Sequence, residues 1–207
     1  MAFLGIDIGT RNLGMCVIRT KISEPIQVIR WENADLFPQA RNVNKIELGK
    51  LMSGAVDRVW DMMTDIGAIA GSVQAPLVMA IERQPNCNPR MKALGASVFS
   101  ACYVYTKLHS NSSVSYVSPG KKFDISTASC INRAALDAQE AKATTRARYA
   151  ANKKDGILTC RMLLDTERLV FLEDSQLLGR EVFDASRKKD DLADSLLIAL
   201  SYAKFTA

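Results

Sequence analysis

The sequence has 207 residues, of which 48% are hydrophobic and 24% are charged, and its formal net charge is +5. This composition excludes fibrous and intrinsically disordered proteins and predicts a single α/β domain over residues 1–207. No apolar run reaches the ~18 residues of a membrane helix, so we expect no membrane partner and no secretory signal.

Strand-like and helical patterns follow one another in the first half of the chain. Short apolar runs at residues 2–8, 13–19 and 26–31 predict three strands, of which the first two are joined by a tight turn. Apolar residues then recur every three or four positions over residues 44–70, which predicts an amphipathic helix. We expect the apolar face of this helix to pack against the sheet.

The middle of the chain predicts a buried strand and a second helix. Residues 77–81 form a continuous apolar run, typical of a strand buried on both faces, and residues 114–117 predict one more strand. Between them, residues 89–108 predict a helix that is apolar or aromatic over most of its circumference. One sheet cannot cover so much apolar surface, so we hypothesise that part of this helix forms a subunit interface.

The last third has one clear element and several unclear ones. We expect a loop at residues 118–140, a helix at 141–164 that breaks near 152–156, and no definite structure at 167–179. Ser186 is predicted to cap a final helix over residues 187–204, in which Leu192, Leu196 and Ala199 belong to an apolar stripe.

The charge is distributed unevenly along the chain. Residues 1–82 carry a net charge of −1, residues 83–161 carry +9, and residues 162–207 carry −3. A strongly basic segment favours a polyanionic partner such as DNA. The candidate DNA-binding residues are Arg83, Lys121, Lys122, Arg146, Arg148, Lys153 and Lys154. Any single one of them is better explained as part of a solvated surface, so the prediction rests on the cluster.

Cysteine and histidine usage narrows the chemistry further. The five cysteines are scattered without a Cys-x-x-Cys pair, which favours buried thiols in a reducing, intracellular compartment over a zinc site. Only one histidine, His109, is present, and it lies in a polar stretch, so a mechanism based on a Ser-His-Asp unit is not expected. Carboxylates, lysines and metal ions must then carry any chemistry.

Carboxylates stand at three chemically suggestive places. Asp7 ends the first predicted strand, Glu82 follows the buried strand, and Asp190, Asp191 and Asp194 lie on the last helix beside its apolar stripe. Each has an ordinary explanation, because an aspartate can shape a hairpin and an acidic run can be a solvated helix start. If the elements converge, however, the carboxylates form an all-oxygen site suited to Mg²⁺ or Mn²⁺.

Three segments together resemble a known family. GIDIGTRNLG, AIERQP and DDLADSLLIAL, in this order, resemble the RuvC-like Holliday junction resolvases of the RNase H-like superfamily, and the sequence looks most similar to their poxviral and fungal mitochondrial branch. The resemblance implies an RNase H-like α/β fold with a mixed central sheet of about five strands flanked by helices. It also implies an extra helical insertion at approximately 119–185, before the C-terminal helix.

The resemblance also implies a site and an activity. The family's four carboxylates correspond to Asp7, Glu82, Asp191 and Asp194, with Asp190 as a possible substitute for Asp191, and they hold two Mg²⁺ ions that Mn²⁺ can replace. A homodimer of this kind nicks four-way junction DNA symmetrically, leaves 5′-phosphate and 3′-hydroxyl ends, and needs no small-molecule cofactor. The family also uses lysines near the scissile phosphate, but no single lysine here is a secure match.

Three other interpretations remain open at this point. The carboxylates also suit another RNase H-like nuclease that cuts an RNA/DNA hybrid or a flap, because the metal site alone does not select the substrate. GIDIGT also resembles the first phosphate loop of actin-like and sugar-kinase-like ATP-binding modules, although a second such loop is missing from the sequence. A non-catalytic DNA-binding dimer is disfavoured because all four carboxylates are present.

Overall fold

The computed structural model describes residues 1–21, 24–69, 76–84, 88–119, 145–166, 169–171 and 180–206. The strands are β1 (Ala2–Ile8), β2 (Asn12–Arg19), β3 (Ile26–Asp35), β4 (Leu77–Glu82), β5 (Ser113–Val117) and β6 (Leu169–Phe171). The helices are α1 (Leu48–Ile69), α2 (Pro89–Leu108), α4 (Thr145–Asp165), α5 (Arg180–Ala185) and α6 (Lys189–Thr206), with a 3₁₀ turn η1 (Val43–Lys45) before α1. None of these helices is long and apolar enough to cross a membrane.

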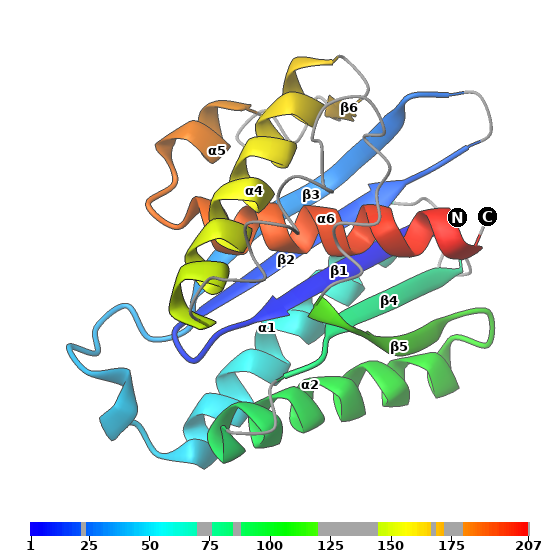
Figure 1. Ribbon diagram of the computed structural model, residues 1–207. Coiled ribbons are helices and arrows are strands. Elements are labelled where there is room, and N and C mark those ends of the chain that lie inside the picture. The colour runs from blue at the N-terminus through cyan, green and yellow to red at the C-terminus, as the bar shows by residue number, and fades with distance from the viewer. Residues whose placement is uncertain are drawn as a thin grey trace.

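One mixed sheet organises the described chain. Its strand order is β5-β4-β1-β2-β3-β6, in which β1, β2 and β3 form an antiparallel meander (Figure 1). Strand β4 lies parallel to β1 and to β5, and β6 lies parallel to β3. The predicted mixed α/β sheet is confirmed. The sixth strand, β6, falls at the start of a stretch to which the sequence pattern assigned no structure.

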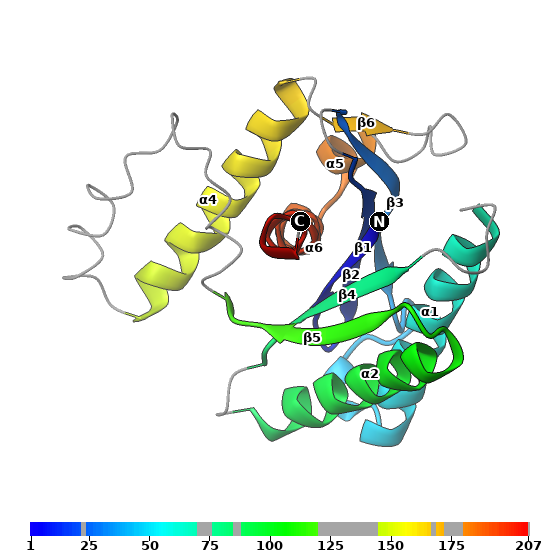
Figure 2. The same cartoon turned by 90° about the vertical axis from the view of Figure 1, so that its right-hand side faces the viewer.

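Helices cover both faces of the sheet. Side chains alternate along a strand, so Leu4 and Ile6 of β1 face a core made with α1 and α2, whereas Phe3 faces a second core made with α6 and α4. Figure 2 shows α1 and α2 on one side of the sheet, and α6 on the other side between the sheet and α4. The sheet is therefore a buried middle layer, which accounts for the nearly continuous apolar sequences of β1, β2 and β4.

Helix α6 is more deeply buried than the sequence pattern predicts. The predicted apolar stripe is present, but Ala193, Ser195 and Ser201, which lie outside that stripe, are also at most 1% exposed. The reason is tertiary: the sheet covers one side of α6, where Ser195 lies against Gly14, and α4 packs on the side that turns away from the sheet (Figure 2). The hydroxyls of Ser195 and Ser201 avoid an unpaired buried state by donating to carbonyls three residues earlier in the same helix.

Two helix predictions need correction. Helix α4 runs from Thr145 to Asp165 without the break predicted near 152–156. Its Gly156 lies against α6, where a larger side chain would be crowded, so packing between the helices accounts for a glycine in the middle of α4. The last helix begins at Lys189, since Ser186 accepts a hydrogen bond from the backbone N–H of Lys188 and forms a turn before the helix. Most of the loop predicted at 118–140 lies outside the described residues.

The cysteines of the described residues are buried thiols. Cys16, Cys102 and Cys160 are all free and inaccessible, and burial raises the pKa of Cys102 to about 12. A thiol that stays protonated at neutral pH packs as a small apolar side chain and is a poor nucleophile. The other two cysteines, Cys87 and Cys130, lie outside the described residues.

Candidate active site

Strand register places two carboxylates side by side. Strands β1 and β4 are parallel neighbours in which Ile6 pairs with Ile81, so the next residues, Asp7 and Glu82, lie together at the carboxyl edge of the sheet. Both follow an apolar residue that faces the α1/α2 core, and the alternation of the strand turns both carboxylates toward the α6 face. The position and the direction of these two side chains are therefore properties of the strands.

Two glycines bring the backbone of α6 onto the sheet. A Cβ atom at Gly5 would lie 2.2 Å from the carbonyl oxygen of Ser195, and one at Gly14 would lie 2.4 Å from that of Asp191. Any larger residue would push the helix away from β1 and β2. The indole N–H of Trp31 also donates to the carbonyl of Leu192 at 2.9 Å, which fixes the same turn of α6 from β3.

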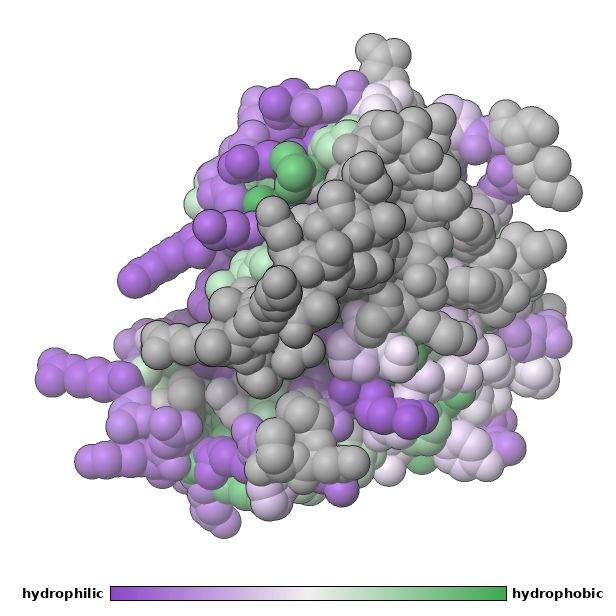
Figure 3. Space-filling model, in the orientation of Figure 1, coloured by the Kyte–Doolittle hydropathy of each residue, from purple (hydrophilic) through white to green (hydrophobic). Residues whose placement is uncertain are grey.

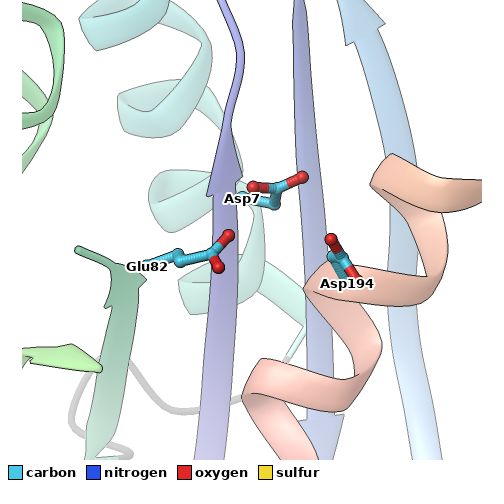
Figure 4. Close-up of side chains that lie close together, drawn as sticks. All are labelled: Asp7, Glu82 and Asp194. Carbon is cyan, nitrogen blue, oxygen red and sulfur yellow. The ribbon is translucent and has the colours of Figure 1, made fainter. Parts of the chain in front are cut away.

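The close packing of α6 on the sheet brings a third carboxylate, that of Asp194, to those of Asp7 and Glu82. Each of Asp7, Glu82 and Asp194 has a carboxylate oxygen within 4.8 Å of the others, and all three side chains are half-buried. Figure 4 shows the carboxylates of Asp7 and Glu82, from the strand ends, and of Asp194, from α6, pointing toward a common centre. The set offers only oxygen ligands, the donor type that hard divalent cations prefer.

The electrostatics of Asp7 point to a missing positive charge. Burial raises the pKa of Asp7 well above its ordinary value of 3.8, and the negative charges of Glu82, Asp194 and Asp191 raise it further. The contact between the Asp7 and Glu82 side chains acts in the same direction. A divalent cation at the centre would offset the repulsion among these carboxylates.

Asp191 lies at the edge of the same group. It lines a hollow of about 720 Å³ together with Asp7, Glu82 and Asp194. Burial raises the pKa of Asp191, and the charge of Asp190 raises it too, while Lys188, Lys153 and a hydrogen bond from Asn12 act in the opposite direction. All four carboxylates implied by the family resemblance therefore face one hollow.

Asp190 has a different partner. Its carboxylate forms an ion pair and hydrogen bond with Lys153 of α4. Burial by itself raises the pKa of Asp190, but the hydrogen bond and charge of Lys153 and the charge of Lys188 outweigh it, so the pKa is lowered. The structure thus directs Asp190 toward α4, and Asp191, at three residues before Asp194, toward the carboxylate cluster.

Two residues of the site were missed by sequence reasoning. A Cβ atom at Gly156 of α4 would lie 3.3 Å from the Oδ1 atom of Asp194, so the glycine leaves room for that carboxylate. Asn12, at the start of β2, lines the hollow and donates to Asp191. Asn12 was within the GIDIGTRNLG motif and could have been suspected, whereas nothing near Gly156 in the sequence marks it as part of the site.

The predicted DNA-binding residues are only partly described. Arg83 and Lys153 line the hollow from opposite walls, and Lys154 is exposed on α4 beside it. Lys121 and Lys122 lie outside the described residues, and the side chains of Arg146 and Arg148 on α4 are not described. The hollow also contains Arg11 and Lys188, which the sequence analysis did not select. The acidic centre is therefore surrounded by basic side chains.

Comparisons with known proteins agree with this geometry. No protein-family model and no curated protein matches the chain. Among solved structures, the yeast mitochondrial Holliday junction resolvase Ydc2 matches with a TM-score of 0.61 and 16% identity, over 98% of this chain and 79% of that one. RuvC of Thermus thermophilus matches with TM-scores of 0.56 in complex with a Holliday junction substrate and 0.55 in a second structure. Both matches have 17% identity and cover 100% of this chain and 95% of that one. The resolvase fold expected from the three motifs is confirmed.

Proposed function

We propose that this chain is a structure-selective DNA endonuclease that resolves four-way junctions by paired, symmetric nicks. The observation that carries the proposal is the convergence of Asp7, Glu82 and Asp194 within 4.8 Å, at the carboxyl edge of a sheet with the resolvase fold. The hollow also contains basic side chains, which attract the phosphate backbone of DNA toward the group of carboxylates.

Asp7, Glu82, Asp191 and Asp194 would hold two Mg²⁺ ions, which Mn²⁺ can replace. Such ions, when bound, lower the pKa of an attacking water and stabilise the leaving 3′-oxygen at phosphorus. The carboxylates of Asp7, Glu82 and Asp194 lie close enough together to share bound cations, and Asp191 lines the same hollow. Hydrolysis by this route leaves 5′-phosphate and 3′-hydroxyl ends and requires no histidine base.

Lys153 is a candidate for contacting the phosphate being cut. It lines the hollow from α4 and is held by Asp190, which limits the positions that its ammonium group can take. A lysine paired with a carboxylate in this way can stay charged and oriented while it donates a further hydrogen bond to a phosphate oxygen.

The two-fold symmetry of a junction calls for two active sites, and we propose a homodimer that uses α2. Helix α2 presents Tyr103, Val104 and Leu108 to solvent with 48%, 50% and 66% of their surface exposed. These side chains belong to the helix whose apolar circumference exceeds what the sheet can cover. A two-fold axis through this face would place identical sites on opposed strands.

A substrate panel tests the activity. Labelled mobile four-way DNA junction, linear duplex, flap and RNA/DNA hybrid are each incubated with the protein and Mg²⁺. Symmetric nicks on the junction that ligase reseals are the expected result. Preferential cutting of the hybrid or the flap would keep the fold and the carboxylate site and overturn the junction assignment. The absence of cutting and binding on every substrate would favour the ATP-binding interpretation instead.

A further inference from the structure

A second hollow adjoins the acidic one. It encloses about 440 Å³ and is lined by Arg11, Asn12, Asn33, Asp35, Ser186, Arg187 and Lys188. Three of these residues, Arg11, Asn12 and Lys188, also line the hollow that contains the carboxylates. The two spaces therefore share a wall made by the β1–β2 turn and the residues just before α6, and one extended ligand can occupy both.

The lining of the second hollow is net positive, whereas the lining of the first contains as many carboxylates as cationic side chains. Its lining includes three cationic side chains and one carboxylate, and that carboxylate, Asp35, is already paired with Arg11 at 3.0 Å. Arg187 is exposed and forms no ion pair within the part of the chain that the structure describes. Lys188 also lines the first hollow, so it lies at the boundary between the two. Because the one carboxylate of the second hollow is paired with Arg11, the net positive charge belongs to Arg187 and Lys188.

Local hydrogen bonds shape the turn that carries Arg187. The hydroxyl of Ser186 accepts a hydrogen bond from the N–H of Lys188 at 3.2 Å, and Lys189 donates from its ammonium group to the carbonyl of Ser186 at 2.9 Å. These bonds define the backbone of the turn between α5 and α6, from which the Arg187 side chain extends. In Figure 3, strongly hydrophilic side chains project from the edge of the molecule where Figure 1 shows the β1–β2 turn and the start of α6.

The hollow also offers an uncommitted amide. Asn33, on β3 opposite Gly14, makes no side-chain hydrogen bond with the described residues, and its Oδ1 atom is buried without a partner. The unpartnered atom is an acceptor, so a water molecule or a donor group of a ligand suits it and a phosphate oxygen does not. The basic side chains of the hollow must therefore supply any phosphate contacts.

We propose that the second hollow binds a phosphate of the cleaved DNA strand that neighbours the scissile one, with Arg187 as the positioning residue. The inference rests on the proposed nuclease function and adds to it a direction for the strand, from the carboxylates across the β1–β2 turn toward β3. Arginine suits this task because its planar guanidinium can bind two phosphate oxygens at once. Anchoring the adjacent phosphate holds the scissile phosphate over an acidic centre that would otherwise repel it.

The experiment tests whether two effects on junction binding depend on each other: the removal of the Arg187 side chain and the neutralisation of a single phosphate. Four-way junctions are prepared with one neutral methylphosphonate linkage at successive positions on either side of the cut. Binding is measured in Ca²⁺, which also takes oxygen ligands, to the intact protein and to Arg187→Ala. Arg19→Ala serves as the matched control, because Arg19 pairs with Ala2 at the opposite end of β1 from Asp7.

We expect one linkage position, on one side of the cut only, to weaken binding by the intact protein about 10-fold, as for a charge-assisted contact. Arg187→Ala should show the same loss with the normal junction and no further loss with that neutral linkage. Its slope of log K against log salt should also fall by about 0.9, the value for one phosphate contact. Arg19→Ala should behave as the intact protein does.

The outcomes separate this inference from the function on which it rests. Independent effects of Arg187→Ala and of every neutral linkage, on a junction that the protein binds and cuts, would overturn the phosphate site alone. A protein that neither binds nor cuts the junction would overturn both proposals.

Discussion

At the scale of single residues, Asp7 determines the properties of the site. Its pKa is raised first by burial and then by the charges of three neighbouring carboxylates, so ionisation of Asp7 costs free energy in the folded chain unless a cation is bound. We expect the same carboxylate to be a ligand of the proposed metal site. Loss of the carboxylate should therefore affect stability and activity in opposite directions.

Replacement of Asp7 by asparagine should abolish cleavage, with a fall of more than about 100-fold in rate, because one acidic ligand of the metal site is removed. Asp190→Asn is the matched control, since Asp190 is a neighbouring carboxylate that pairs with Lys153. It should keep a measurable share of the activity. Single-turnover cleavage of the labelled junction measures both variants, and equal loss in the two would contradict the assignment of the ligands.

The pH dependence of stability should identify the same group. The pKa of Asp7 is higher in the folded chain than its ordinary value of 3.8, so the folded state binds the proton more tightly than the unfolded state does. Its contribution to stability is therefore complete below about pH 4 and is lost as pH rises through the folded-state pKa. Urea unfolding in EDTA should show this fall, while Mg²⁺ or Asp7→Asn should reduce it. A profile unchanged by the substitution would refute the prediction.

At the scale of elements, the site depends on how closely α6 lies between the sheet and α4. Gly5 and Gly14 allow the backbone of α6 to approach the sheet, and Gly156 allows α4 to approach Asp194. At each of these positions, the absence of a side chain allows the two elements to pack closely. Substitutions on the α4 side should change the position of a ligand before they disturb the fold, because the crowded atom there belongs to a side chain.

Gly156→Val should reduce cleavage about 10-fold or more, because its side chain would displace the Asp194 carboxylate from the other two. The matched control is Gly49→Val in α1, where added atoms meet only the end of the Glu47 side chain, at 3.9 Å. Both variants are compared for junction cleavage, for the Mg²⁺ concentration that gives half-maximal activity, and for urea stability. A similar metal requirement in both would show that α4 does not position Asp194.

At the scale of the whole molecule, the candidate active site and the exposed apolar surface lie in different places. The carboxylates lie at the end of β1 and β4, whereas the exposed residues Tyr103 and Leu108 lie near the far end of α2. This separation allows two copies to associate without blocking either site. It also makes oligomeric state and the chemistry of a single site separable by mutation.

Leu108→Glu should convert the protein from a dimer to a 22.8 kDa monomer, because a buried charge without a partner would oppose association. On a supercoiled plasmid that extrudes a cruciform, the monomer should make single nicks, whereas the proposed dimer should make paired cuts. The control is Leu158→Glu, at another exposed leucine (49% exposed) on α4. Sedimentation velocity measures the masses, and a dimer that persists in Leu108→Glu would exclude this face.

The elements that build the site follow from the amino-acid sequence. Short apolar runs identify β1 and β4, and Asp7 and Glu82 stand where those runs end. The order of the three motifs, which resembles that of the resolvases, predicted the fold that the structure and its matches confirm. The burial of a strand and the order of motifs along the chain are both evident in the sequence, because neither depends on which distant segments come into contact.

Only the tertiary structure decided which groups meet. Helical spacing relates Asp194 equally well to Asp190 and to Asp191, and the choice depends on Lys153, which α4 brings to Asp190. In the same way, Gly156 belongs to the site only because α4 crosses α6, and Arg187 gains its possible role only because the start of α6 lies beside the β1–β2 turn. Periodicity indicates that one face of a helix or strand is buried, but it does not indicate which element covers that face. Contacts between distant segments depend on how whole elements pack.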